Sequence, residues 1–397
     1  MDLENEFPVL EELIYLNHAA VAPWPRRTAE AVARFAEENL LRGALRYEAW
    51  LEVEQALREQ ARRLLGAAAA EDVALLKNTS EGLSLVAQGL DWRPGDRVVL
   101  PAEEFPSNRI PWEALRPQGV EVVEVPLAGS EDPEARLAEA LEGAGQPIGG
   151  PPAAAARRGA GTRLLAVSWV QYRDGLRLDL ARLGRLCRER GALLCVDAIQ
   201  GLGALPLDVE AAGVDFAVAD GHKWLLGPEG LALFWCRPEL REALRLREHG
   251  WHMVEHAGDF ERRDWRPAAS ARRFECGSPN MLGIHALHAS LSLLLEVGIA
   301  EVAARVEARV GQLREALATL PGVRLLTPAQ PERRAGILSL ELPGVELGRL
   351  AAWLREEGVV CAVRGGALRL SPHFYTPAEQ LDRAVELLAC WLEREEG

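Results

Sequence analysis

Short apolar runs recur along most of the chain, and helical patterns separate them. The runs lie at 73–76, 97–100, 121–125, 164–170, 193–196, 216–219 and 231–235. Each has the length and composition of a strand. Because strands and helices alternate, the pattern predicts a mostly parallel sheet with helices on both faces.

Two longer helical patterns and a second group of apolar runs frame this series. One helical pattern spans 28–65, and another spans 284–320 and connects to C-terminal runs at 337–342 and 367–372. The Gly/Ala/Pro-rich stretch 143–163 is typical of a surface loop. We therefore expect three parts, namely an N-terminal segment that packs on the small domain, a large domain, and a connector helix with a small C-terminal α/β domain, at 1–20, 21–280 and 281–397.

Length and composition narrow the class of protein. The 397 residues are too many for one ordinary domain, and 48% of them are hydrophobic. No run of about 18 apolar residues occurs, and the acidic N-terminus lacks the apolar core of a signal peptide, so we expect a cytoplasmic protein. A net charge of −14 argues against nucleic acid or an anionic membrane as a partner. The six scattered cysteines form no CxxC pair and are expected to be reduced.

Lysine occurs only twice in the chain, at Lys77 and Lys223, so nearly all the basic charge comes from arginine. Arginine replaces lysine readily for solubility, but only lysine can lose its proton near neutral pH and form an imine. Codon bias with chance retention would explain Lys77. It explains Lys223 poorly, because that lysine lies inside a dense motif, DGHKWLLGP.

Three predicted strand ends carry polar residues, and open α/β sheets bind ligands at such ends. Thr79 and Ser80 begin a helical pattern and could hold an anion together with the backbone N–H groups there. On its own, an ordinary N-cap with Glu81 as a capping-box glutamate would explain this segment better. Asp197 could pair with a protonated pyridine nitrogen. Lys223, preceded by His222, is expected to be buried with a lowered pKa, which suits imine formation; a surface turn is the alternative. Together these parts predict a site for pyridoxal 5′-phosphate (PLP).

Five segments in the same order resemble the class V aminotransferase family, across nearly the whole chain. These fold-type I PLP enzymes include cysteine desulfurases, C–S lyases, kynureninases and isopenicillin N epimerases. The resemblance implies an α/β fold-type I PLP-dependent transferase fold, with a mostly parallel seven-stranded sheet in the large domain and a smaller C-terminal α/β domain. The segments are YLNHAAVAP (15–23), RPGDRVVLPAEEFPSNRIPW (93–112), VDAIQGLGALPLDVEAAGVDFAVADGHKWLLGPEG (196–230), FECGSPN (274–280) and LRLSPHFYT (368–376).

The resemblance implies roles for the residues around the cofactor. Lys223 would bind PLP as a Schiff base and move the proton at Cα. Asp197 would face the pyridine nitrogen, and Gln200 the 3′-oxygen of the ring. The phosphate would be held by Thr79, Ser80 and His222.

The resemblance also implies contacts from other loops and from a second subunit. Phe105 would stack on the ring, and Tyr172 and Gln171 would lie beside its 3′-oxygen, with Gln171 near the substrate. The substrate carboxylate would be bound by Arg369, a task that suits its bidentate fork, with Arg364 as a second substrate contact. Ser278 would reach the phosphate of the neighbouring subunit, which implies a homodimer with shared active sites.

Three departures from the family pattern bear on the reaction. Cysteine desulfurases need a cysteine on the loop ahead of the carboxylate-binding arginine, and VRGGALR (363–369) has none. Cys361, just upstream, is expected on a strand in the core. Phe105 replaces a histidine that desulfurases use as an acid–base group. Asp220 stands where a phosphate-binding serine is common, so we expect it to point away or to bond locally. Sulfur transfer is therefore disfavoured.

The remaining reactions need only Lys223 as the acid–base group, namely transamination, β-elimination and epimerisation. We favour transamination, because it needs no further acid for a leaving group, with a C–S β-lyase next and an epimerase also open. A non-catalytic PLP-fold binding protein is the alternative of another class, and the joint retention of Lys223, Asp197 and Arg369 argues against it. A metal site is not expected, because the histidines in EHGWHMVEHAGDF (248–260) form no HExxH motif.

Overall fold

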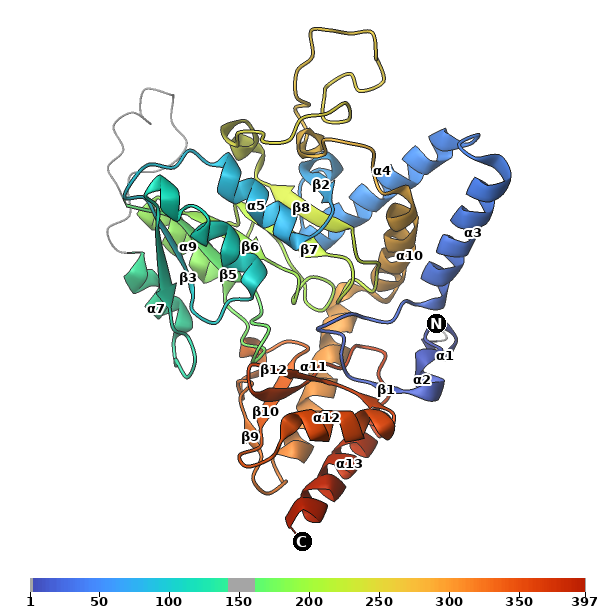
Figure 1. Ribbon diagram of the computed structural model, residues 1–397, viewed down its shortest axis with the longest axis vertical. Coiled ribbons are helices and arrows are strands. Elements are labelled where there is room, and N and C mark those ends of the chain that lie inside the picture. Colours follow the sequence, from blue (N-terminus) through green and yellow to red (C-terminus); the bar gives the residue numbers. More distant parts are fainter. Residues whose placement is uncertain (1–2, 142–160, 397) are drawn as a thin grey trace.

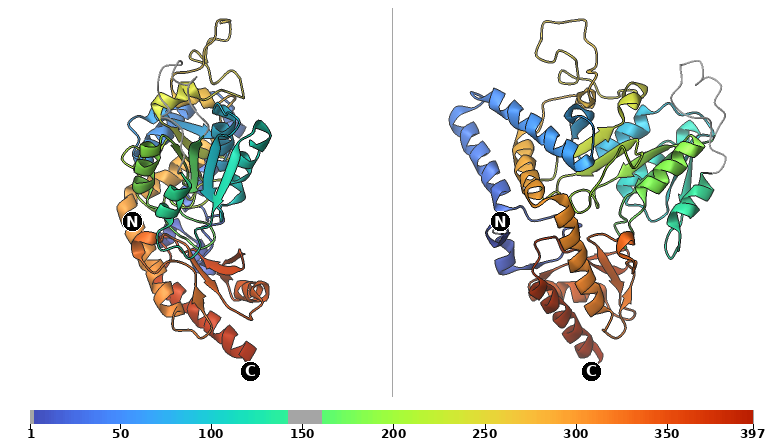
Figure 2. Two further views of the ribbon diagram at one scale, coloured as in Figure 1. Left: turned by 90° about the vertical axis from the view of Figure 1, so that its left-hand side faces the viewer. Right: turned by 180° about the vertical axis from the view of Figure 1, so that it is seen from behind.

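The computed structural model describes residues 3–141 and 161–396 of the chain (Figure 1). These residues form a large domain around one wide sheet and, below it in Figure 1, a smaller domain that contains the C-terminus. Figure 2 shows the orange helical segment near residue 300 running from the large domain into the small one.

The large sheet confirms the predicted mostly parallel, seven-stranded arrangement. Its strands are β2 (Val73–Leu76), β3 (Arg97–Pro101), β4 (Glu121–Val125), β5 (Thr162–Ser168), β6 (Leu193–Asp197), β7 (Phe216–Asp220) and β8 (Ala232–Cys236). They lie in the order β2-β8-β7-β6-β5-β3-β4. Strand β8 is antiparallel to both neighbours, β2 and β7, and the other pairings are parallel.

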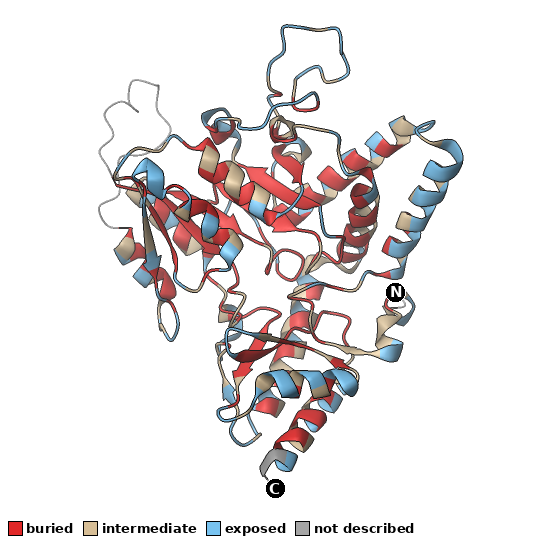
Figure 3. Ribbon diagram, viewed as in Figure 1, coloured by how far each residue is buried: buried red, intermediate tan, exposed pale blue. Residues whose placement is uncertain are grey.

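Helices cover both faces of this sheet, as the strand–helix alternation predicted. Alternate residues of a strand point to opposite faces, so Leu164 and Ala166 of β5 join one apolar core while Leu165 and Val167 join the other. Figure 3 shows the buried sheet between the two layers. One layer contains α5 (Thr79–Gly89) and α6 (Ile110–Glu113), and the other contains α4 (Tyr47–Leu65), α7 (Pro133–Ala140), α9 (Leu180–Arg190) and α10 (Met281–Val297).

The small domain has a sheet and a core of its own. Its four strands are antiparallel and lie in the order β12-β13-β10-β9. They are β9 (Arg324–Leu325), β10 (Leu338–Glu341), β12 (Ala362–Arg364) and β13 (Ala367–Leu370). A third apolar cluster joins this sheet to the helices α11 (Ile299–Leu317), α12 (Leu347–Glu356) and α13 (Ala378–Glu396).

The N-terminal segment contacts both domains. After α1 (Leu3–Glu6) and α2 (Val9–Glu12), strand β1 (Ile14–Tyr15) pairs in parallel with β11 (Val359–Val360) of the small domain. A few residues later, the Ala22 N–H donates to the His222 carbonyl at 2.8 Å, beside Lys223. The boundaries drawn at residues 20 and 280 remain predictions.

Two expectations about long helices were wrong, because a glycine interrupts each pattern. The pattern at 28–65 forms α3 (Arg26–Arg42) and α4, with Gly43 at φ +55° between them. The pattern at 284–320 forms α10 and α11, which meet at Gly298 (φ +87°) with a bend of 83°. Positive φ at a glycine commonly ends a helix, and amphipathic periodicity continues across such a break.

The expected loop at 143–163 lies mostly outside the described residues. Strand β5 has already begun at Thr162, so the last two positions of that expectation were wrong. No single described helix is long and apolar enough to cross a membrane, and α10 and α11 meet that test only as a bent pair.

Candidate active site

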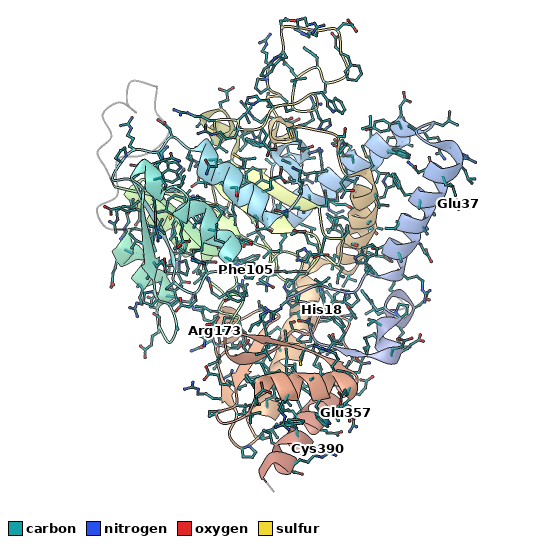
Figure 4. All side chains as sticks on the ribbon, viewed as in Figure 1. His18, Glu37, Phe105, Arg173, Glu357 and Cys390 are labelled. Carbon is teal, nitrogen blue, oxygen red and sulfur yellow. The ribbon has the colours of Figure 1, made fainter. Side chains whose placement is uncertain are left out.

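A pocket at the carboxyl ends of the parallel strands brings together residues from five separate segments. Its lining residues are Thr79, Phe105, Ser107, Ser168, Tyr172, Asp197, Ile199, Gln200 and Lys223. Six of the residues singled out from the sequence therefore meet in one place. Figure 4 shows Phe105, which lines this pocket, together with Arg173 and His18 around the junction of the two domains.

A tight turn after β7 holds Lys223 in the pocket. The Leu226 N–H donates to the Lys223 carbonyl at 3.0 Å, and the Gly227 N–H donates to the Gly221 carbonyl at 2.8 Å. Nζ of Lys223 lies 5.6 Å from the centre of the Phe105 ring. Burial lowers the pKa of Lys223 to about 8, with Asp197 opposing the shift and Arg369 adding to it. The lowered pKa raises the fraction of neutral amine, the form that imine formation requires.

Asp197 is the last residue of β6, and its carboxylate faces the same pocket. Oδ1 accepts a hydrogen bond from the Ile199 N–H at 3.0 Å, which fixes the carboxylate. Burial raises the pKa of Asp197 to about 6, and the charge of Lys223 partly offsets this. Among the described residues, no basic side chain lies within 4.0 Å of the carboxylate. The carboxylate is therefore free to accept a hydrogen bond from a protonated ring nitrogen in the pocket.

The residues of the predicted anion cradle lie at the start of α5. Asn78, not Thr79 or Ser80, caps the helix, because its side chain accepts the Glu81 N–H at 2.9 Å. An ordinary N-cap is therefore present beside the two hydroxyls, and the Glu81 carboxylate accepts the Lys77 N–H at 2.5 Å, one residue before the cap. Oγ1 of Thr79 accepts the Asp220 N–H at 3.1 Å and keeps its own hydrogen to donate. Oγ of Ser80 donates to Ser107 Oγ at 2.9 Å, at the edge of the pocket.

Asp220 bonds locally, as expected from its acidic charge. Its Oδ1 lies 3.0 Å from Nδ1 of His222. Because the carboxylate is engaged by the imidazole, its repulsion of a phosphate on Thr79 and His222 is reduced.

Gln200 is anchored at both ends of its amide. Oε1 accepts the Trp224 Nε1–H at 2.9 Å, and Nε2 donates to the Ala19 carbonyl at 3.0 Å. One Nε2 hydrogen remains for an oxygen in the pocket. The amide thus ties the N-terminal segment to the residue that follows Lys223, and contact with a ring oxygen stays a prediction.

Glu104 is a site residue that sequence reasoning missed. It is buried, and its carboxylate accepts hydrogen bonds from the Ser168 N–H at 2.6 Å, from Ser168 Oγ at 2.5 Å and from Gln171 Nε2 at 3.1 Å. Burial raises the pKa of Glu104 to about 7, and the bonds from Ser168 partly offset this. Glu104 therefore fixes the end of β5 and the start of the loop that carries Tyr172.

In the wild type, Glu104 is expected to make the protein less stable as pH rises, and replacing it with glutamine should abolish this pH dependence. The pKa of this carboxyl rises from 4.5 to about 7 on folding, so its contribution to stability falls as pH rises across that range. The isosteric amide can keep the hydrogen bonds without titrating. The melting temperature of Glu104→Gln relative to wild type should thus rise by a few °C between about pH 5 and pH 8. Thermal melts at both pH values test this, and an unchanged difference would contradict it.

Tyr172 packs edge-on against Phe105, with ring centres 5.2 Å apart. The Tyr172 carbonyl accepts a hydrogen bond from Nη1 of Arg369 at 2.9 Å, which brings the small domain to the pocket. Burial lowers the pKa of Arg369 to about 10, and Arg364 adds to this. Gln171 directly precedes Tyr172 on this loop, and its Oε1 is buried without a hydrogen-bond partner.

Ser278 lies apart from the other predicted residues. It is exposed and lines a different pocket, with Lys77, Gly230 and Cys276. The described chain therefore does not bring Ser278 to its own Lys223, and a role across subunits stays a prediction.

One group of side chains has the geometry to bind a metal ion, but an arginine already pairs with its carboxylates. Of the histidines in the segment 248–260, His252 lies near Glu54 and Glu275. Arg58 bonds both glutamates, at 2.5 Å to Glu54 and 2.6 Å to Glu275. A cation among these groups would have to compete with a buried guanidinium.

The charged side chains around the pocket, and buried polar atoms that lack hydrogen-bond partners, fit PLP. Buried atoms without hydrogen-bond partners around it include Nε of Arg369 and Oε1 of Gln171. Buried polar atoms in folded proteins are nearly always bonded, so these atoms indicate a polar ligand. The Thr79 hydroxyl, the start of α5 and His222 would hold the phosphate, Phe105 and Asp197 would hold the ring, and Lys223 would bind it covalently.

Comparison with known proteins identifies the family of the chain. The family profile described as Aminotransferase class-V matches residues 14–383. A cysteine desulfurase of Klebsiella pneumoniae (strain 342) is 32% identical over 94% of this chain and 90% of its own. YcbU of Bacillus subtilis (strain 168), described as an uncharacterized aminotransferase, is 28% identical over 96% of this chain and 95% of its own.

Solved structures share the fold. The cystine C–S lyase C-DES, in complex with cysteine persulfide, superposes with a TM-score of 0.86 at 23% identity, over 96% of this chain and 99% of its own. A C-DES variant with glycine covalently linked to its PLP cofactor gives a TM-score of 0.87 at 22% identity, over 97% and 98%. At these identities the likeness confirms the fold-type I architecture alone. With the profile matching nearly the full length, the chain belongs to the class V aminotransferase family, whose cofactor is pyridoxal 5′-phosphate.

Proposed function

We propose that this protein is a PLP-dependent aminotransferase that acts on the α-carbon of an amino acid. The hairpin of β12 and β13 is the observation that carries the proposal. Gly365 and Gly366 make up its whole turn, and no cysteine lies between Arg364 and Arg369. Cys361 is buried, and burial raises the pKa of its thiol to about 11, so it stays protonated. A persulfide-forming thiol has no place in this hairpin.

The chain's own residues can carry out the proton movements of transamination. When bound, PLP supplies an electron sink for the bonds at Cα. Nζ of Lys223, with its pKa lowered to about 8, can take a proton from Cα and return it. Arg369 holds the substrate carboxylate, and Asp197 provides the negative charge that a protonated ring nitrogen needs. Phe105 has no titratable group, so Lys223 is the acid–base residue of this proposal.

A C–S β-lyase is the second candidate, favoured by the relatives named cysteine desulfurase. It would use the same residues, because both reactions begin with the loss of the Cα proton to Lys223. In that case this protein would release sulfur from its substrate by β-elimination, rather than transfer it to a cysteine thiol of the protein.

Product analysis separates these candidates. The holoenzyme is incubated with a panel of amino acids, including cysteine and cystine, with and without 2-oxo acids. The proposal expects pyridoxamine phosphate and a new 2-oxo acid. Pyruvate with sulfide would favour the lyase instead, and the release of neither product set would contradict both candidates.

We also propose that the active protein is a homodimer that shares its active sites. The exposed position of Ser278 supports this, because a residue at the family's phosphate-contacting position lies away from the chain's own pocket. Exposed aromatic side chains of the segment 251–265, at Trp251, Phe260 and Trp265, offer apolar surface for a second copy. Light scattering of the holoenzyme is expected to give twice 43.4 kDa, and a monomer would contradict this.

A further inference from the structure

Two arginines share the face of the β12–β13 hairpin that meets the pocket. In the antiparallel register Arg364 lies opposite Ala367, and Arg369 lies opposite Ala362, so these four side chains point to one face. Leu368 points to the other face and is buried in the small-domain core. Since Arg369 bonds the Tyr172 carbonyl of the large domain, the shared face is the pocket face.

Neither arginine is neutralised by the protein. Among the residues that the structure describes, no carboxylate lies within 4.0 Å of either guanidinium. The hydrogen bond of Arg364 goes to the carbonyl of its own neighbour, Val363, at 3.0 Å, and Nε of Arg369 is buried without a partner. Arg173, close by, pairs with Glu341 at 3.5 Å. Arg369 is buried, and a buried guanidinium with no carboxylate beside it indicates that an anion from outside the chain neutralises it. Arg364 is exposed to solvent on the same face of the hairpin, where it can contact the same anionic molecule.

The hairpin holds the two arginines at a fixed spacing. Gly365 and Gly366 have φ values of +56° and +78°, which suit a two-residue turn between twisted strands. Nε of Arg173 donates to the Gly365 carbonyl at 3.2 Å, and a Cβ on Gly365 would lie only 2.9 Å from Cδ of Arg173. The turn is therefore fastened to the large domain. Diagonal positions on such a hairpin are roughly 7–8 Å apart, a spacing that suits two anionic groups of one small molecule.

We propose that the substrate of this enzyme carries two carboxylates, with Arg369 binding the α-carboxylate and Arg364 the second one. The substrate class is then an acidic amino acid of the size of aspartate or glutamate, together with the matching 2-oxo diacid. This inference rests on the proposed function, because it assumes an amino-acid substrate at Lys223. Arg364 lies at the exposed end of the hairpin, so the side-chain carboxylate would point toward the mouth of the pocket.

Kinetics with matched substrate pairs test this inference. Glutamate and aspartate are compared with glutamine and asparagine, which differ in the charge of the side chain. The Arg364→Gln variant is expected to raise KM for the acids by roughly tenfold or more, and to raise KM for the amides by a much smaller factor. Arg364→Lys should restore part of the loss. Arg383→Gln, which removes an exposed arginine on α13, is the matched control and should behave as wild type.

A binding measurement without turnover provides the second readout. Calorimetry with succinate, a diacid that has no amine, is expected to show tighter binding to the wild-type holoenzyme than butyrate shows, and Arg364→Gln should abolish the difference. If amides and acids are used equally and Arg364→Gln changes neither KM nor succinate binding, this inference is overturned and the proposed function stands. If no amino acid of any charge is converted or alters the cofactor's absorption, the proposed function fails and the inference fails with it.

Discussion

Replacing Lys223 with alanine is expected to lower turnover by at least about 10³-fold, because the variant loses both the covalent attachment of the cofactor and the acid–base group. The rate at saturating substrate measures this. Lys223→Arg should not restore activity, since a guanidinium stays protonated and cannot form an imine.

The second lysine of the chain provides a matched control. Lys77 lies on the surface, with 72% of its side chain exposed, and pairs with Glu81 at 3.4 Å. Lys77→Ala is expected to keep the wild-type rate within about twofold, as exposed ion pairs contribute little. Equal losses in the Lys77 and Lys223 variants would mean that charge or folding, rather than the position of Lys223, explains the effect.

Replacing Asp197 with asparagine is expected to have the next largest effect. The amide keeps the size of the side chain but cannot hold a proton on the pyridine nitrogen, so the cofactor becomes a weaker electron sink. A charge pair of this kind in a partly dry site is worth a few kcal/mol, which corresponds to a fall in kcat of roughly 10²–10³-fold. The variant should still bind PLP on Lys223, which absorption of the purified protein can show.

Asp215 allows a comparison at equal burial. Burial raises the pKa of Asp215 to about 6, as it does for Asp197. Asp215 accepts the Leu194 N–H at 2.7 Å and pairs with Arg237 at 3.1 Å, away from the pocket. Asp215→Asn should therefore lower the melting temperature without a comparable fall in kcat. A similar fall in kcat in both variants would show that the Asp197→Asn effect comes from a less stable fold, and not from a contact with the cofactor.

The site residues at the strand ends could be predicted, because charged side chains there lie directly beside buried apolar strands. Asp197 ends one apolar run that the sheet buries, and Lys223 follows the next run after a short turn. A charged group at such a point needs a partner or a function. The parallel sheet then brings these ends together without further information about side-chain contacts. This is why the pocket at β6 and β7 follows from the sequence once strand–helix alternation is recognised.

The role of Glu104 could not be predicted, because two glutamates follow β3 in succession. The structure turns them in opposite directions. Glu103 accepts the backbone N–H groups of Leu127 and Ala128, and Glu104 turns inward to Ser168. The direction of each glutamate depends on its partner, which is Leu127 and Ala128 after β4 for Glu103 and Ser168 at the end of β5 for Glu104. The local sequence around β3 does not encode the position of these partners. A run of acids after a buried strand was the signal available.

The partners of Gln200 were equally hidden. Its position after β6 indicates a pocket residue, but its bonds go to Ala19 and Trp224, which come from distant parts of the chain. The breaks at Gly43 and Gly298 were missed for a related reason. Amphipathic spacing resumes after each glycine, so hydrophobic periodicity alone does not show that the helix axis has changed direction.

Chemical trapping of the cofactor tests the central claim most directly. The holoenzyme is reduced with borohydride, digested, and mapped by mass spectrometry for the peptide that carries a phosphopyridoxyl group. Because the chain has only two lysines, the assignment is unambiguous. The account predicts the group on Lys223 alone; its appearance on Lys77, or its absence from both peptides in a yellow, active preparation, would contradict it.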